Sequence, residues 1–195
     1  MLKLKAKKQS FLFIVAALLF IACSPDQFML NKQNDRPLYG FIMSDLDSVQ
    51  KTADNELRLH GGGIAAVRAE EITQLDADMT VKIISGDGLR FSFRTVSNEY
   101  DTNPGISFDF TPNGCTVKEK DKLLTSVDSI KAKPGSRSRI HIKNDGIHFF
   151  ITVDCDTVIH STTNLCSTEY IILKSLYSTE ALVSSINFSS IRVNE

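Results

Sequence analysis

The chain lacks several features that mark common functional classes. It has no tryptophan, and its 195 residues include only 5 prolines and 10 glycines, with 23% charged and 42% hydrophobic residues. This composition excludes a collagen-like or disordered chain. It also lacks a basic excess: four of the 22 basic residues lie in positions 1–22, where there is no acid, so the rest carries 18 basic against 23 acidic residues. The acidic remainder argues against a nucleic-acid partner, which requires a basic surface.

No hydrophobic run is long enough to span a bilayer. The longest, Phe11 to Ala22, has 12 residues, whereas a spanning helix needs about 20. A basic stretch that ends at Lys8 precedes this run, and the run itself ends on the small residue Ala22. This is the pattern of a secretory signal. We therefore predict a signal peptide over residues 1–22.

The residue after this segment is Cys23, preceded by Phe20-Ile21-Ala22. This junction resembles the bacterial lipoprotein signal, although that family prefers leucine where this chain has Phe20. The resemblance implies acylation of Cys23, with palmitate among the fatty acids, and anchoring to a lipid bilayer. The alternative is an ordinary secreted protein with a chance cysteine.

Ser24, by resemblance to enterobacterial sorting, implies the outer membrane as the destination within the cell envelope. The polar segment 23–37 is almost free of pattern, and we predict that it is a flexible tether. Residues 38–195 then form the folded part, which is long enough for one domain.

From Asn55 onward, apolar and polar residues alternate with period two between turn residues, which predicts short strands. No stretch carries a convincing helical stripe, and the segment Asp45 to Asn55 is the one candidate for a short helix. Strands without intervening helices predict an all-β, antiparallel β-sandwich, with a closed barrel as the alternative. The alternating runs lie at 57–59, 64–67, 81–83, 89–93, 106–110, 140–142, 147–153, 171–173 and 186–191.

One hairpin can be predicted in detail, because Asp145-Gly146 is a strong two-residue turn signal. Pairing outward from this turn sets Lys143 opposite His148 and His141 opposite Phe150. The predicted core face is Ile140, Ile142, Phe149, Ile151 and Val153, and the opposite face is His141, Lys143, His148, Phe150 and Thr152. Two histidines, a lysine and a phenylalanine on one sheet surface suit sugar binding, although the absence of tryptophan counts against stacking. The alternative is a solvated polar face.

Several segments resemble the concanavalin A-like lectin and glucanase superfamily, which is a jelly roll of two curved antiparallel sheets. The resemblance covers most of residues 57–193 and rests on "LRLHGGGIAAV" (57–67), "GDGLRFSFR" (86–94), "EYDTNPGISFDF" (99–110), "RIHIKNDGIHFFITVD" (139–154), "TEYIIL" (168–173) and "VSSINFSSIRV" (183–193). It implies a jelly-roll fold and carbohydrate binding.

The resemblance also implies individual roles. Asp87 matches the legume-lectin aspartate that accepts hydrogen bonds from sugar hydroxyls. Glu99, Asp101 and Asn103 match the oxygen ligands of the lectin metal loop, which would hold calcium. The loop turns back without the further Asp and His of the family, and because calcium takes 6 to 8 oxygens, the calcium interpretation rests on half a site. A surface hairpin with solvated acids is the alternative, and no other cofactor is expected.

Catalytic signatures are missing. The spaced carboxylates of superfamily glucanases, Glu-x-Asp-x-x-Glu, do not occur, and neither does a Gly-x-Ser-x-Gly elbow. Asp76 and Asp78 share a face, but the sequence shows no partner that would tune them. We therefore expect a membrane-anchored envelope protein that is not an enzyme and whose jelly roll binds carbohydrate. The alternatives are an accessory subunit that docks on another envelope protein and, third, a divergent glycoside hydrolase.

Three cysteines remain if Cys23 is acylated. Cys155 and Cys166 bracket a short connection between two predicted strands, and in an oxidising compartment we predict a disulfide between them, adding roughly 2 to 3 kcal/mol. Cys115 would then be single. A zinc site is the alternative, but the close paired spacing is missing.

Overall fold

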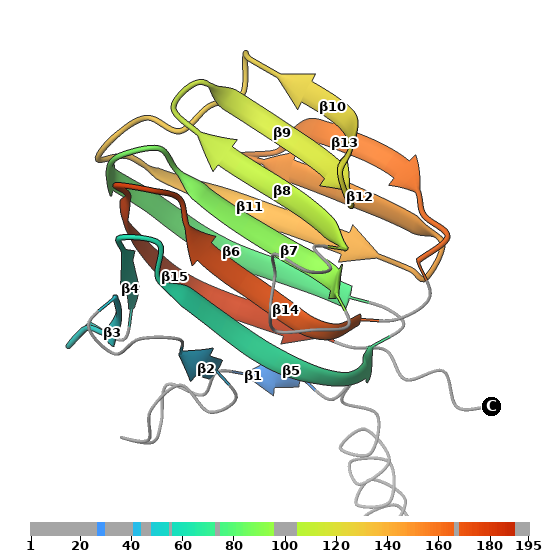
Figure 1. Cartoon of the computed structure of the whole chain (residues 1–195), viewed down its shortest axis with the longest axis horizontal. Helices are drawn as coiled ribbons and strands as arrows, with labels where there is room; N and C mark the ends of the chain where they lie inside the picture. The colour runs from blue at the N-terminus through green and yellow to red at the C-terminus, as the bar shows by residue number, and fades with distance from the viewer. Residues whose placement is uncertain are drawn as a thin grey trace, which may run out of the picture.

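The computed structural model describes residues 27–29, 41–43, 48–54, 56–72, 75–95, 105–165 and 168–189. Over this part the protein has fifteen strands and no helix, arranged in two sheets whose pairings are all antiparallel (Figure 1). The all-β sandwich predicted from the alternating sequence is confirmed. None of the described residues belongs to a helix that could cross a membrane.

We call the eight-stranded sheet sheet A. Its order is β13 (Asp156–Thr162), β12 (His148–Val153), β11 (Arg137–Asn144), β6 (Leu75–Ser85), β15 (Glu180–Ser189), β4 (Leu57–His60) and β3 (Val49–Lys51), with β1 (Gln27–Met29) pairing with β15.

We call the seven-stranded sheet sheet B. Its order is β10 (Lys122–Val127), β9 (Gly114–Glu119), β8 (Ile106–Thr111), β7 (Leu89–Thr95), β14 (Thr168–Ser175), β5 (Ile64–Ile72) and β2 (Phe41–Met43).

The core lies between the two sheets and follows from the period of two. In β6 every second residue from Leu75 to Ile83 is at most 1% exposed, and the residues between them are half-buried. Phenylalanines from β7 and β8 fill the opposite side, with Phe91 and Phe93 at a centroid distance of 6.1 Å. Each fully buried side chain of this size contributes about 1.5–3 kcal/mol, so this layer is the main source of stability.

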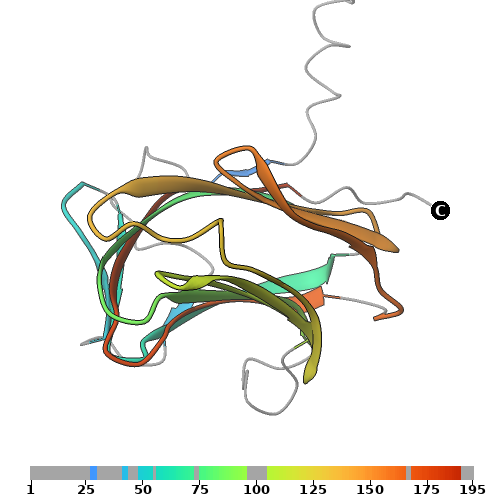
Figure 2. The same ribbon diagram turned by 90° about the horizontal axis from the view of Figure 1, so that it is seen from above.

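The two sheets curve in the same sense (Figure 2). The outer face of sheet B is therefore the hollow side of its curve, and the outer face of sheet A is convex. This difference decides which surface each predicted ligand residue occupies.

The β11–β12 hairpin confirms the predicted faces and corrects the predicted register. Asn144 pairs with Phe149, two positions from the prediction, because the turn is wider: the Asp145 amide donates to the His148 carbonyl at 3.0 Å. The Asp145 side chain also accepts from the His148 amide at 2.8 Å. A shift of two residues keeps every side chain on its face. The predicted core residues, Ile140, Ile142, Phe149, Ile151 and Val153, are all at most 2% exposed.

Two further segments differ from expectation. The candidate helix at 45–55 is wrong, because Val49–Lys51 is strand β3 and pairs with β4, which buries Val49. Within the predicted tether 23–37, Gln27–Met29 is strand β1, which pairs with Asn187–Ser189 of β15.

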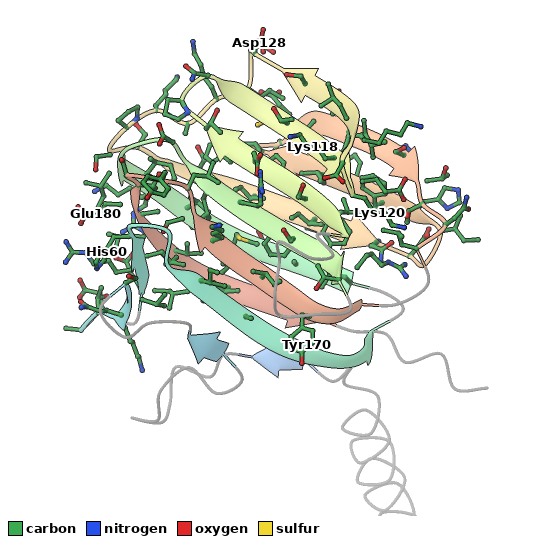
Figure 3. All side chains as sticks on the ribbon, in the orientation of Figure 1. His60, Lys118, Lys120, Asp128, Tyr170 and Glu180 are labelled. Atoms are coloured by element: carbon green, nitrogen blue, oxygen red, sulfur yellow. The ribbon has the colours of Figure 1, made fainter. Side chains whose placement is uncertain are left out.

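The strand register defines two ends of the sandwich. At one, the glycine-turn end, lie the turns Gly61–Gly63, Gly86–Gly88 and Leu176–Thr179. At the other, the Arg94 end, lie Lys120–Asp121, Asp145–Ile147 and Thr163–Leu165. In Figure 3, His60 and Glu180, which are cross-strand partners, lie at the glycine-turn end, and Lys120 lies toward the other.

Candidate functional site

The predicted ligand-binding residues fall into two separate places. Asp87 is exposed in the turn between β6 and β7, at the glycine-turn end, whereas His141, Lys143, His148 and Phe150 lie on the outer face of sheet A. Strand β6, of 11 residues, runs from one end to the other, and at about 3.3 Å per residue it separates Asp87 from the β11–β12 turn by roughly 30 Å. The five residues therefore do not form one site.

The expectation of a concave groove lined by these residues is also wrong. The outer face of β11 and β12 belongs to the convex side of the sandwich (Figure 2). A convex sheet offers a shallow platform to a ligand, not an enclosed groove.

The outer face does gather aromatic rings. Phe150 packs edge-on against His160 of β13, with centroids 6.0 Å apart and an interplanar angle of 88°, and His148 lies 6.4 Å from His160. Lys143 is the cross-strand partner of Phe150 and is exposed. We call these four residues, Lys143, His148, Phe150 and His160, the ring patch. Sequence reasoning missed that His160 belongs here, because it did not predict β13.

Two charged pairs lie on the same face, between β6 and β11. The His141 Nε2 atom lies 2.7 Å from Asp76 Oδ1, and the Arg139 Nε donates to Asp78 Oδ1 at 2.8 Å. The hydrogen bond from Arg139 lowers the pKa of Asp78 below its usual value and keeps that carboxylate ionised. The sequence showed no partner for Asp76 and Asp78; both partners come from the adjacent strand β11.

The hollow outer face of sheet B presents uncharged residues and an ion pair. Ala66, Ser92, Ser107 and Ile172 point outward, yet they are at most 3% exposed. Next to them, Arg90 binds Asp109 through two hydrogen bonds of 2.6 and 2.8 Å.

Lys174 of β14 is the cross-strand partner of Arg90 on this face. Burial, with the neighbouring guanidinium second, lowers the pKa of this lysine. Arg90 and Asp109 are therefore paired with each other, and Lys174 is partly buried beside them, so this face is a less open binding surface than the ring patch.

Arg94 is a buried residue that sequence reasoning did not single out. The pairing of β7 with β14 shifts by one residue here, and Arg94 has a φ of 59°, which marks a β-bulge. The bulge turns its side chain inward, where it donates to the Leu165 carbonyl (2.9 Å), Asn144 Oδ1 (3.0 Å) and the Gly146 carbonyl (2.6 Å). Arg94 thus links strand β7 to the β11–β12 turn and to the segment that follows β13.

A pocket of about 500 Å³ opens beside this network. It is lined by Glu119, Lys120, Asp121, Lys122, Asn164 and Leu165. The Thr163 hydroxyl donates to Glu119 Oε1 at 2.5 Å, which joins the segment after β13 to the β9–β10 hairpin. The pocket is lined by both acidic and basic residues, so it has no strong preference for a ligand of either charge.

The predicted calcium ligands Glu99, Asp101 and Asn103 lie outside the described residues. Within the described part, no three His, Cys, Asp or Glu side chains are grouped to hold a metal ion. The flanking residues Thr95 and Gly105 lie at the Arg94 end, so the length of β7 separates them from Asp87. Calcium binding by this loop stays a prediction.

The cysteines are arranged differently from the expectation. Cys115 is buried and Cys155 is an exposed free thiol, while Cys166 lies outside the described residues. The assumption that Cys155 and Cys166 bracket a short connection is wrong, because β13 follows Cys155 directly and extends for seven residues. The disulfide stays a prediction.

Comparison with known proteins identifies the fold. No family model and no curated protein matches the sequence. Among solved structures, the chain is similar to the carbohydrate-binding module CBM66 from Bacillus subtilis, with a TM-score of 0.61, 12% identity and coverage of 77% of this chain and 96% of that one. The exoplasmic/lumenal domain of VIP36, solved with Ca²⁺ and mannose, has a TM-score of 0.59, 11% identity and coverage of 80% and 84%.

A proposed glycosyl hydrolase from Parabacteroides distasonis is also similar, with a TM-score of 0.65, 14% identity and coverage of 79% and 95%. These identities establish the fold alone. The chain has the concanavalin A-like jelly roll that the sequence segments predicted.

Proposed function

We propose that this chain is a lipid-anchored, non-catalytic carbohydrate-binding protein of the bacterial cell envelope. The jelly roll forms the binding domain, and acylated Cys23 holds it on a membrane, which we take to be the outer membrane. Calcium is a candidate cofactor through Glu99, Asp101 and Asn103. The fold supports this proposal because the similar structures include a carbohydrate-binding module and a lectin domain solved with mannose.

The observation that carries the proposal is the ring patch. A sugar ring stacks its apolar face on an aromatic side chain while its hydroxyls bond to nearby polar groups. Phe150 is half-buried and oriented by His160, so its ring is held in place, and Lys143 and His148 are exposed beside it. The patch therefore combines a fixed ring with hydrogen-bonding groups.

The same face supports binding without hydrolysis. Retaining hydrolysis needs one carboxylate as nucleophile and a second, protonated one as acid. Asp76 and Asp78 are neighbours on one face, but each is engaged by a basic partner, His141 and Arg139. Because Arg139 lowers the pKa of Asp78, this aspartate does not supply a proton near neutral pH.

The adaptor alternative requires a contiguous apolar docking surface. In the described part of the chain the large exposed hydrophobic residues are Ile84, Leu123, Ile147 and Tyr177. They come from β6, β10 and two different turns. This scatter favours glycan binding over an apolar protein interface.

The test is a glycan-array screen of the protein purified in detergent, followed by titration of the best hit. Phe150→Ala removes the stacking ring and Lys143→Ala removes a charged hydrogen-bond donor, so each is expected to weaken binding about tenfold or more. Leu123→Ala, an exposed apolar residue on β10, is the matched control and should leave affinity unchanged. No saturable binding to any glycan at millimolar concentration would contradict the proposal.

The anchor is tested separately. Cys23→Ala should abolish labelling of the protein by a fatty-acid probe in cells, because the acylated thiol is removed. Label that persists in this variant would refute acylation at Cys23.

A further inference from the structure

We propose that the ring patch binds glycans that contain uronic acids, and that protonation of His148 and His160 strengthens this binding at mildly acidic pH. The inference rests on the proposed function and names the class of glycan that the same patch takes. It follows from the charged groups on the outer face of sheet A and from the partners that each of them has.

The nitrogen groups of the patch surround one aromatic ring. Lys143, Phe150 and His160 are successive cross-strand partners on β11, β12 and β13, so they form a row about 10 Å wide. His148 precedes Phe150 by two residues on the same face, and its ring centroid lies 6.4 Å from that of His160. A sugar that stacks on Phe150 therefore has nitrogen groups on both sides.

The aspartates of β6 on this face do not neutralise the patch. Asp76 is the cross-strand partner of Lys143, but its carboxylate lies against His141 instead, with Nε2 and Oδ1 2.7 Å apart. Asp78 is paired with Arg139. Among the described residues, Lys143 forms no ion pair with a carboxylate. Its ammonium group is therefore available to an anionic ligand.

The two imidazoles face a single carboxylate within the described part of the chain. His148 Nδ1 lies 3.4 Å from Asp145 Oδ2, whereas His160 contacts rings and has no acidic partner there. Strand β10 lies against β13 from sheet B, and its charged residue, Lys122, is the cross-strand partner of Glu119. This pair adds no net charge, so Asp145 alone opposes the lysine and the two imidazoles of the patch.

Acidification gives the patch a net positive charge. Imidazole side chains gain a proton between about pH 7.5 and about pH 5.5. At the higher pH the charges of Lys143 and Asp145 balance, and at the lower pH two imidazolium charges are added. Two imidazolium groups at the separation of His148 and His160 repel each other, and a bound anion offsets this repulsion. Binding of the anion and binding of protons therefore favour each other.

A uronic acid matches these groups. The apolar face of its ring stacks on an aromatic side chain, and its carboxylate accepts charge-assisted hydrogen bonds from ammonium and imidazolium groups. Phe150 supplies the ring, and the lysine and the histidines of the patch supply the donors. This carboxylate stays ionised above about pH 5, so acidification changes the charge of the protein and not that of the sugar. The convex surface lets a chain of sugars lie across the patch (Figure 2).

The experiment titrates the intact protein in detergent by calorimetry, at about 0.15 M ionic strength, with two matched pairs of trisaccharides. The pairs are trigalacturonate with galactotriose of the same linkage, and cellotriose with its triuronic acid counterpart. At least one acidic trisaccharide should bind about fivefold or more tightly at pH 5.5 than at pH 7.5, because two exposed ion pairs are added. Its binding should take up protons. The neutral counterpart should bind more weakly and without this pH dependence.

Variants assign the effect to the patch. Lys143→Gln should weaken binding of the acidic trisaccharide about threefold or more at both pH values, and replacing His148 and His160 together with glutamine should abolish the pH dependence. Lys82→Gln is the charge control, since Lys82 lies on the same face of sheet A beside Arg137 and outside the patch. It should leave the affinity within about twofold.

The outcomes separate this inference from the proposed function. An equal loss in Lys82→Gln and Lys143→Gln, or a pH dependence that survives the double histidine variant, would indicate general charge attraction and overturn the inference. Tighter binding of the neutral trisaccharides, or no binding of either acidic one at millimolar concentration, would overturn the assignment of uronic acids. A neutral hit on the array would then leave the proposed function standing, and an array without any hit would contradict both.

Discussion

Replacing Arg94 with methionine is predicted to destabilise the domain strongly, because it removes the donor that joins three connections. Arg94 is 2% exposed and donates to the Leu165 carbonyl, to Asn144 Oδ1 and to the Gly146 carbonyl. A hydrogen bond to a charged group is worth about 1.5–3 kcal/mol, and these bonds do not add fully. Each buried acceptor left without its donor costs about 1–3 kcal/mol, so we expect the loss of three such bonds in Arg94→Met to cost about 3–5 kcal/mol.

The control for this prediction is Arg139→Met, since the Arg139 side chain is 70% exposed and bound to Asp78 at the surface. Exposed pairs contribute about 0–1 kcal/mol. Urea unfolding followed by circular dichroism measures both. With a slope near 2 kcal/mol per molar urea, the midpoint should fall by about 1.5–2.5 M for Arg94→Met and by less than about 0.5 M for Arg139→Met. Equal midpoints for the two variants would refute the structural role of Arg94.

Three further outcomes are expected. Gly86→Ala should destabilise the protein more than Gly135→Ala. Both glycines have positive φ, where alanine is strained by about 1–3 kcal/mol, but only at Gly86 would the added methyl also clash with the backbone of Ser178. Equal unfolding midpoints for the two variants would contradict the contact between Gly86 and Ser178. Asp78→Asn should lower stability at neutral pH by less than about 1 kcal/mol. Because the folded pKa of Asp78 is lowered from 3.8, this difference should vanish as the pH falls from 3.8 through the folded pKa, and a pH-independent difference in urea titrations would refute the ion pair. Maleimide at about pH 8 should label exposed Cys155 and spare buried Cys115, whose pKa is raised to about 12; mass spectrometry after native labelling checks this, and an unreactive Cys155 would revive the predicted disulfide.

The fold could be predicted because the core-forming strands alternate cleanly. In β11 the apolar residues occupy every second position, and in β12 only Phe150 departs from this pattern, so the inward face followed from the sequence even though the register did not. A shift of two residues leaves the faces unchanged, and the turn geometry that sets the register depends on the Asp145 side chain.

The edge strands could not be predicted from this pattern. Strands β10 and β13 lie at the edges of their sheets, and both present mainly exposed or half-buried residues. Edge strands bury less of their surface, so their apolar periodicity is weak. The missed strand β13 hid the contact between His160 and Phe150 and led to the assumption of a short connection between Cys155 and Cys166.

The candidate site could be predicted only in part from the sequence. The sequence placed His141, Lys143, His148 and Phe150 on one face, but it gave no information on the curvature that makes this face convex.

The central claim is that this jelly roll binds sugar without cleaving it. The most direct measurement takes the best array hit, titrates the intact protein with it by calorimetry, and then assays the same sample for new reducing ends. We predict a saturable binding heat and no new reducing ends after prolonged incubation. Release of reducing ends, or the absence of saturable heat with every glycan tested, would contradict the account.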